Sequence, residues 1–173
     1  MKINWDRLVE DLNCGTRGGD DLAMAAITKA LGEGWVIEAI EYYLSHSVGG
    51  ELARSVLGLL RPQEARDYCI HLFMTDPDLD RRRTAVNLLR AVALRDTLPH
   101  VSTFLRDPDP TIQNWGAGVL DQLLWCQFVE PEECADALEL MRAHPNDEVV
   151  STYQWITEFL ANRSSDQGCG PVA

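Results

Sequence analysis

The histidines and cysteines of this chain are the residue types best suited to bind a metal ion or to act as a nucleophile. None of the four histidines has a second histidine four residues away or a glutamate directly after it. The five cysteines are an odd number without a C-x-x-C pair. Their spacing therefore predicts no metal site and predicts reduced thiols. The residues concerned are His46, His71, His100 and His144, and Cys14, Cys69, Cys126, Cys134 and Cys169.

The sequence motifs of the common enzyme classes are absent. There is no H-E-x-x-H zinc motif, no G-x-S-x-G nucleophile motif and no phosphate-binding G-x-x-x-x-G-K-[ST] loop. The glycine-rich segment 15–19 precedes a predicted helix, where backbone N–H groups are able to hold an anion, but it lacks a lysine and a preceding strand. We interpret this segment as a turn between helices, and we predict a protein that is not an enzyme and needs no cofactor.

Tryptophans in the C-terminal part of the chain indicate a different function, the binding of another protein. Tryptophan is enriched in the hot spots of protein interfaces, and the alternative is that these rings fill gaps between helices. The tryptophans concerned are Trp115, Trp125 and Trp155, and the first two belong to a helix expected over 110–127. The stripe of this helix that should pack inward contains Ile112, Gly116, Leu120, Leu123 and Leu124. A different stripe contains Trp115, Gly118, Gln122 and Trp125.

Negative charge is concentrated in the same part of the chain. From Asp107 to the C-terminus there are 12 acidic and 2 basic residues, whereas residues 1–106 hold 15 acidic and 13 basic residues. Such a charge attracts basic proteins and repels nucleic acids, or it serves solubility alone. We predict that Asp121, Asp147 and Glu148 belong to one partner-binding site with Gln122 and the three tryptophans.

The helices that position these residues begin at a signal that recurs along the chain. Asp76-Pro77-Asp78 and Asp107-Pro108-Asp109 are 31 residues apart, and a weaker copy begins at His144-Pro145-Asn146. Aspartate or asparagine caps the first free N–H groups of a helix, and proline fixes a backbone angle that suits the helix start. A fourth copy aligns Val56, Leu59 and Leu60 with Ala85, Leu88 and Leu89. The repeat therefore predicts a series of helical hairpins.

Amphipathic segments lie between these signals, and none of them alternates like a β-strand. The first helices of five hairpins are expected over 4–12, 34–46, 63–75, 96–106 and 131–143. The second helices are expected over 20–31, 50–60, 79–93, 110–127 and 147–162. We predict an all-α protein with a single domain over 1–162 and a flexible tail over 163–173.

The spacing D-P-D-P-x-[VI]-[RQ]-x-x-[AG]-A over 107–117, with a weaker echo over 76–86, resembles the second-helix signature of HEAT repeats. This resemblance implies a right-handed α-solenoid of about five HEAT-like helical hairpins, in which the second helices line the concave face. It also implies that Trp115, Trp125 and Trp155 lie on one inner surface. The chain departs from the pattern at Arg81, where the consensus has a valine, and at Gln113, where the consensus has an arginine.

Together these features predict a non-catalytic module whose concave face and acidic C-terminal hairpins bind a basic protein. A small acidic protein of this kind is similar to bacterial immunity proteins that inhibit nuclease toxins, and an adaptor or regulator is the other interpretation within this class. The alternative class is a HEAT-like enzyme, either a DNA glycosylase, which needs a basic concave surface, or an accessory lyase that attaches bilins.

The remaining expectations concern location and assembly. No apolar run approaches about 18 residues, so we expect no membrane-spanning helix. The first residues do not resemble a secretory signal, because they carry acidic residues early and lack an apolar stretch. We predict a cytoplasmic monomer that does not bind nucleic acid directly.

Overall fold

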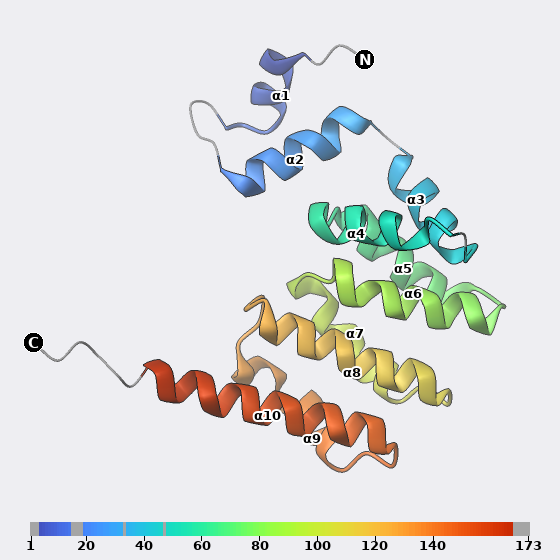
Figure 1. Ribbon diagram of the computed structural model, residues 1–173, viewed down its shortest axis with the longest axis vertical. Helices are drawn as coiled ribbons and strands as arrows, with labels where there is room; N and C mark the ends of the chain where they lie inside the picture. The colour runs from blue at the N-terminus through green and yellow to red at the C-terminus, as the bar shows by residue number, and fades with distance from the viewer. Residues whose placement is uncertain (1–3, 15–18, 33, 47, 168–173) are drawn as a thin grey trace, which may run out of the picture. The chain divides into compact units, whose positions relative to one another are not determined.

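The computed structural model describes residues 4–14, 19–32, 34–46 and 48–167, with side chains as far as Arg163. In these residues the chain forms ten α-helices, two 3-10 helices and no β-strand, which confirms the prediction of an all-α protein (Figure 1). The chain divides into two compact units, Met1–Val92 (unit 1) and Ala93–Ala173 (unit 2). A single domain over 1–162 stays a prediction.

Unit 1 is built from helices that pack in pairs along the chain. The helix α3 packs against α4, and α5 packs against α6. Corresponding helices also meet, because α3 contacts α5 and α4 contacts α6. The fully buried side chains of these helices include Ile40, Leu57, Cys69, Leu88 and Leu89. The helices are α1 (Trp5–Asp11), α2 (Asp20–Leu31), α3 (Trp35–Leu44), α4 (Gly50–Leu60), α5 (Gln63–Thr75) and α6 (Leu79–Val92).

Unit 2 repeats this pattern of packing. The helix α7 packs against α8, α10 packs against α9, and the two pairs meet through α7 with α9 and α8 with α10. The fully buried side chains include Phe104, Ile112, Leu120, Met141 and Ile156. The elements are η1 (Arg95–Thr97), α7 (Leu98–Leu105), α8 (Pro110–Trp125), η2 (Pro131–Cys134), α9 (Ala135–Arg142) and α10 (Asp147–Gln167).

All ten predicted helices are present, and the largest difference concerns the C-terminal end. The helices α2, α4 and α5 begin and end at the predicted residues. Residues 163–167 were expected in a flexible tail, but they continue α10 because no glycine or proline interrupts the chain before Gly168. The rest of the expected tail, 168–173, lies outside the described residues.

The recurring helix-start signal forms the same hydrogen bonds in three places. Asp76 Oδ1 accepts from the N–H of Asp78 at 2.9 Å, and Asp107 Oδ1 accepts from the N–H of Asp109 at 2.9 Å. In the third copy His144 replaces the aspartate, and its Nδ1 accepts from the N–H of Asn146 at 3.1 Å. A second such bond follows two residues later in every copy. These turns satisfy N–H groups that a helix start leaves without a partner, and they set where α6, α8 and α10 begin.

The fourth copy of the repeat does not have the burial that its alignment implies. Leu88 is fully buried in α6, whereas the aligned Leu59 of α4 is 69% exposed. The fully buried residue of α4 is Leu57, which lies about 200° around the helix from Leu59. The aligned residues form a helix in both places, but Leu59 does not share the burial of Leu88.

An ion-pair cluster joins three helices of unit 1. Arg81 of α6 donates from Nη2 to Glu41 of α3 at 2.9 Å and from Nε to Asp76 at 2.8 Å. Tyr68 of α5 donates its hydroxyl to Glu41 Oε1 at 2.7 Å. The hydrogen bonds from Arg81 lower the pKa of Glu41 and of Asp76, and the hydrogen bond to Glu41 raises the pKa of Tyr68. Arg81 therefore forms salt bridges with two carboxylates of unit 1.

We predict that Arg81→Gln destabilises the protein at neutral pH but not in acid. The folded-state pKa values of Glu41 and Asp76 are depressed below their ordinary 4.5 and 3.8, so the stabilisation is present above those values and is lost as the pH falls through the folded-state pKa values. Urea denaturation from pH 7 to pH 3 measures this, with Arg83→Gln on the same helix as the control, since Arg83 pairs with the exposed Asp80. A difference from the unmodified protein that does not shrink in acid would contradict the prediction.

Unit 2 depends on a close approach of α7 and α8 at Gly116. A Cβ atom at this position would lie 2.4 Å from the Cβ of Phe104, which is too close for any side chain without movement of a helix. Phe104 is fully buried and cannot turn away from the contact. The glycine is therefore required by packing, and its backbone angle does not explain it.

We predict that Gly116→Ala lowers the free energy of unfolding by about 1–3 kcal/mol, because the two helices must separate. The matched control is Gly50→Ala at the start of α4, where the nearest atom to a new Cβ, Cδ2 of Tyr43, is at an ordinary 3.5 Å. This control should change stability by less than about 1 kcal/mol. Thermal denaturation of both variants is the measurement, and equal effects at the two positions would show that the approach of α7 and α8 is not tight.

Candidate aromatic and acidic surface

The helices α8 and α10 of unit 2 lie side by side and run in the same direction (Figure 1). At their N-terminal ends, Asn146 Nδ2 donates to the carbonyl oxygen of Pro110 at 3.1 Å and to Gln113 Oε1 at 3.0 Å. Towards their C-terminal ends, the rings of Trp125 and Phe159 are in contact, with centroids 4.9 Å apart. These contacts at both ends set the register of the two helices.

The predicted inward stripe of α8 is confirmed. Leu120, Leu123 and Leu124 are fully buried, as are Ile112 and Gly116. Because this stripe faces α7 and the core, the opposite stripe of α8 is left on the surface of unit 2. The side chains of this outer stripe are therefore available to form a site.

Two of the three predicted tryptophans lie on the surface. Trp125 is 61% exposed and Trp155 is 70% exposed, which excludes both from the core. Phe159 follows Trp155 by four residues and therefore lies on the same face of α10, and its other neighbour is Trp125. We call Trp125, Phe159 and Trp155 the aromatic patch.

Trp115 does not join this patch. It is half-buried, and it precedes Trp125 by ten residues on the same helix. Ten residues of α-helix correspond to about 15 Å along the axis and to a rotation of about 80°. Gln122 lies between the two tryptophans and donates from Nε2 to Asp121 at 3.2 Å.

The predicted acidic residues occupy two places on these helices. Asp121 is half-buried and precedes Trp125 by one helical turn. Asp147 and Glu148 are exposed in the first turn of α10, where the positive end of the helix dipole favours carboxylates whether or not a partner is bound. Glu158, three residues after Trp155, is exposed and belongs to the same surface. The sequence analysis missed Glu158 and Phe159, although their spacing from Trp155 was a usable signal.

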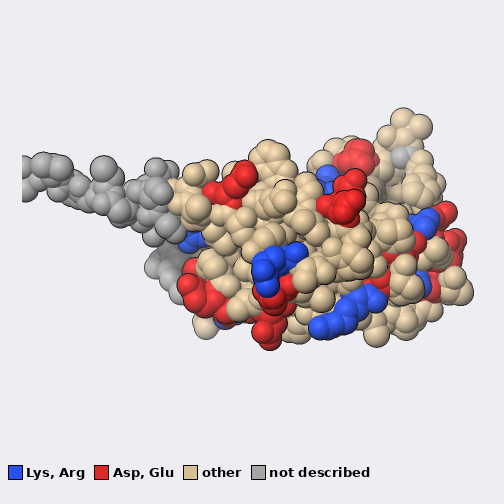
Figure 2. Space-filling view, turned by 90° about the horizontal axis from the view of Figure 1, so that it is seen from below, with Lys and Arg blue, Asp and Glu red and all other residues tan. Residues whose placement is uncertain are grey.

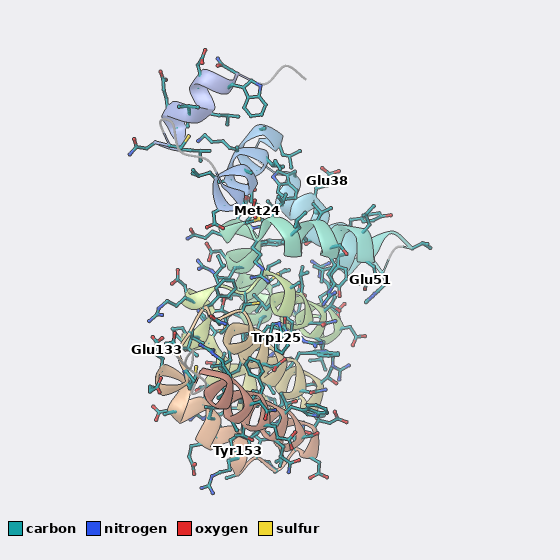
Figure 3. All side chains as sticks on the ribbon, turned by 60° about the vertical axis from the view of Figure 1, so that its left-hand side comes forward. Met24, Glu38, Glu51, Trp125, Glu133 and Tyr153 are labelled. Carbon is teal, nitrogen blue, oxygen red and sulfur yellow. The ribbon has the colours of Figure 1, made fainter. Side chains whose placement is uncertain are left out.

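Three of the four arginines of unit 2 pair with carboxylates other than Asp121 and Glu158. Arg142 pairs with Glu139 at 2.6 Å and lowers the pKa of that carboxyl group, and Arg95 pairs with Glu133. Arg163 approaches Glu130 to 4.0 Å. Glu133 lies at the margin of unit 2, apart from Trp125 (Figure 3). Among the described residues no lysine or arginine pairs with Asp121 or Glu158 near the aromatic patch, or with Asp147 and Glu148 at the start of α10.

On the face shown in Figure 2 the charged side chains do not form one continuous patch. In the view from below, basic side chains lie beside acidic ones and are separated by broad uncharged areas (Figure 2). By sequence, unit 2 nevertheless contains 13 acidic and 4 basic residues, a net charge of −9.

Three of the side chains of types suited to catalysis, His144, Cys69 and Cys134, are buried. His144 is buried, and since its Nδ1 accepts from Asn146, its Nε2 donates to the carbonyl oxygen of Leu105 at 2.8 Å. Burial raises the pKa of the Cys69 thiol, and it raises the pKa of Cys134 to about 11, so both thiols stay protonated and unreactive at neutral pH. No three His, Cys, Asp or Glu side chains in the described part of the chain are grouped to hold a metal ion.

Two further predictions concern the glycine-rich segment 15–19 and the absence of a membrane-spanning helix. Of the glycine-rich segment, residues 15–18 lie outside the described residues, and Gly19 directly precedes α2. No helix in the described part of the chain has the length and the hydropathy that are needed to cross a membrane.

No family model, no curated protein and no solved structure matches this chain. A function has to be inferred from the side chains and contacts of the chain itself. The aromatic patch and the unpaired carboxylates around it are the strongest basis for that inference.

We predict that Trp155→Ala changes the free energy of unfolding by less than about 0.5 kcal/mol, because the side chain is largely exposed. Ile156→Ala, at the next residue, is the control and should cost about 2–5 kcal/mol, since Ile156 is fully buried. Chemical denaturation of both variants measures the difference. A loss in the tryptophan variant as large as that in the isoleucine variant would assign Trp155 to the core.

Proposed function

We propose that this chain is a non-catalytic protein-binding module, in which the surface of α8 and α10 binds a basic protein. The observation that supports this most directly is the pair of exposed tryptophans, Trp125 and Trp155, beside carboxylates that have no cationic partner among the described residues. Large exposed aromatic side chains with a charged rim are typical of interface hot spots. Exposed apolar groups of this size otherwise carry a cost in solubility.

We further propose that the fold is a HEAT-like right-handed α-solenoid of about five hairpins. The packing of successive helix pairs within each unit supports this, as do the matching hydrogen bonds at the starts of α6, α8 and α10. In such a solenoid the second helices line one face, which is how α8 and α10 come to share the binding surface.

The charge of unit 2 supports a basic partner. A net charge of −9 on this part of the chain would accelerate association with a positively charged protein and would repel the phosphates of nucleic acids. The tryptophans would act later, because desolvated aromatic contacts slow dissociation. The two features therefore contribute to different steps of one binding event.

Within this class we favour an immunity protein or an inhibitor of a basic toxin, such as a nuclease, acting as a cytoplasmic monomer. An adaptor or regulator of another cellular protein would use the same surface. No contact in the described residues favours the alternative of a HEAT-like DNA-base enzyme or accessory lyase. A DNA enzyme in particular would need a basic groove where α8 and α10 carry carboxylates.

The test is affinity capture with the purified chain from the cells in which it occurs, followed by mass spectrometry and by measurement of the captured protein's affinity. We predict that Trp125→Ala and Trp155→Ala each weaken this binding by more than about 1 kcal/mol, roughly fivefold or more. Trp5→Ala is the matched control, because Trp5 is equally exposed but lies in α1, and it should leave the affinity unchanged.

The captured protein should be basic, and its association should slow as salt is added. Replacing Asp121, Glu148 and Glu158 by their amides should slow association in the same way. An association rate that responds neither to salt nor to these substitutions would refute the proposed acidic interface.

A further inference from the structure

We infer that the aromatic patch recognises an arginine side chain of the partner, stacked on Trp155 between two carboxylates. This inference rests on the proposed function and specifies which chemical group of a basic protein the surface takes. It depends on three features of unit 2, namely the open ring of Trp155, the register of α8 and α10, and the lack of a described lysine or arginine paired with Asp121 or Glu158.

The indole of Trp155 is open to solvent. It is 70% exposed, and among the described residues it makes no ring contact, whereas Trp125 already packs against Phe159. A cation placed over an indole face is attracted by the ring's negative quadrupole, and tryptophan is the strongest of the aromatic residues in this respect. Trp155 therefore offers a free surface for a flat cation.

One carboxylate beside this ring comes from the same helix. Glu158 follows Trp155 by three residues, a spacing that places the Cβ atoms of two helical residues about 5–6 Å apart on one face. Glu158 is exposed and pairs with no described lysine or arginine. Its carboxylate is thus free to accept hydrogen bonds from a group lying on the indole.

A second carboxylate comes from the neighbouring helix. Because α8 and α10 run parallel and Trp125 contacts Phe159, residues one turn earlier on each helix lie at the same level. Asp121 lies one turn before Trp125 on α8, and Trp155 lies one turn before Phe159 on α10. Asp121 and Trp155 are therefore at the same level. Gln122 donates to only one oxygen of Asp121, which leaves the other oxygen able to accept.

This arrangement suits arginine better than lysine. A guanidinium group is planar, so it can stack on the indole while its edges donate to carboxylates on two sides. An ammonium group is a compact and strongly hydrated charge that cannot satisfy a ring face and two separate carboxylates equally well. The exposed part of Trp125 would then cover the apolar stem of the arginine side chain.

The arginine must come from another molecule. Arg95, Arg142 and Arg163 of unit 2 pair with Glu133, Glu139 and Glu130, which belong to η2, to α9 and to the residue before η2. None of these arginines pairs with the carboxylates at the patch. The charge of the surface is thus complementary to a partner's arginine.

The experiment titrates the full chain with three peptides of equal length, in which glycine and serine alternate with two arginines, two lysines or two citrullines. The indole N–H signals of the five tryptophans are followed by NMR, so that Trp5, Trp35 and Trp115 serve as internal controls. The arginine peptide should move the Trp155 signal and should bind at least about threefold more tightly than the lysine peptide. The neutral citrulline peptide should leave the signal in place.

Substitutions test whether the carboxylates of Asp121 and Glu158 contribute to binding of the arginine peptide. Asp121→Asn combined with Glu158→Gln should weaken binding of the arginine peptide at least about fivefold. Glu139→Gln removes a carboxylate of the same unit that already pairs with Arg142, and it should change this binding less than about twofold.

The outcomes separate this inference from the proposed function. Equal binding of the lysine and arginine peptides at Trp155 would overturn the choice of arginine and would leave a basic partner standing. A Trp155 signal that responds to no peptide would overturn the inference altogether. The proposed function would fail instead if the captured protein binds independently of both Trp155 and salt.

Discussion

The side-chain hydrogen bonds at the starts of α8 and α10 are the constraint on which the proposed site depends. Asp107 and His144 each accept from the N–H two residues later, and the residue that donates this N–H accepts a second bond of the same kind. His144 also joins the end of α7, and Asn146 joins the start of α8. Together with the contact of Trp125 and Phe159, these bonds fix the register of α10 against α8.

The proposed binding surface of α8 and α10 combines exposed tryptophans with carboxylates that lack a cationic partner among the described residues. Folded proteins usually avoid both features unless they serve a function. Exposed tryptophans contribute little to the stability of the folded protein, and carboxylates without nearby cations repel one another. Three of the arginines of unit 2 pair with Glu130, Glu133 and Glu139 instead, and none of them pairs with Asp121 or Glu158 near the patch. A cationic partner would relieve both costs at once, which is why the two features favour the same function.

Sequence patterns predicted the helices and the inner stripe of α8, but only part of the candidate site. Period and composition singled out Trp125 and Trp155 but left open whether they fill gaps between helices, and the structure shows that both are exposed. Period and composition failed for Trp115, which lies on the same outer stripe as Trp125 yet is half-buried. They also failed for Leu59, which was aligned with the buried Leu88 but is exposed. A stripe shows which residues share a face, and it does not show what covers that face.

The sequence by itself determined the all-α class, the place of each helix and the negative charge of the C-terminal part, because helix caps and apolar periodicity are local and charge is additive. Only the tertiary structure decided that Trp125 meets Phe159, that Asp121 is level with Trp155 and that the arginines pair away from this surface. The contact of Trp125 with Phe159 and the ion pairs Arg95–Glu133 and Arg163–Glu130 join residues more than 30 positions apart. They depend on how two helices pack and on their register, which no local pattern specifies.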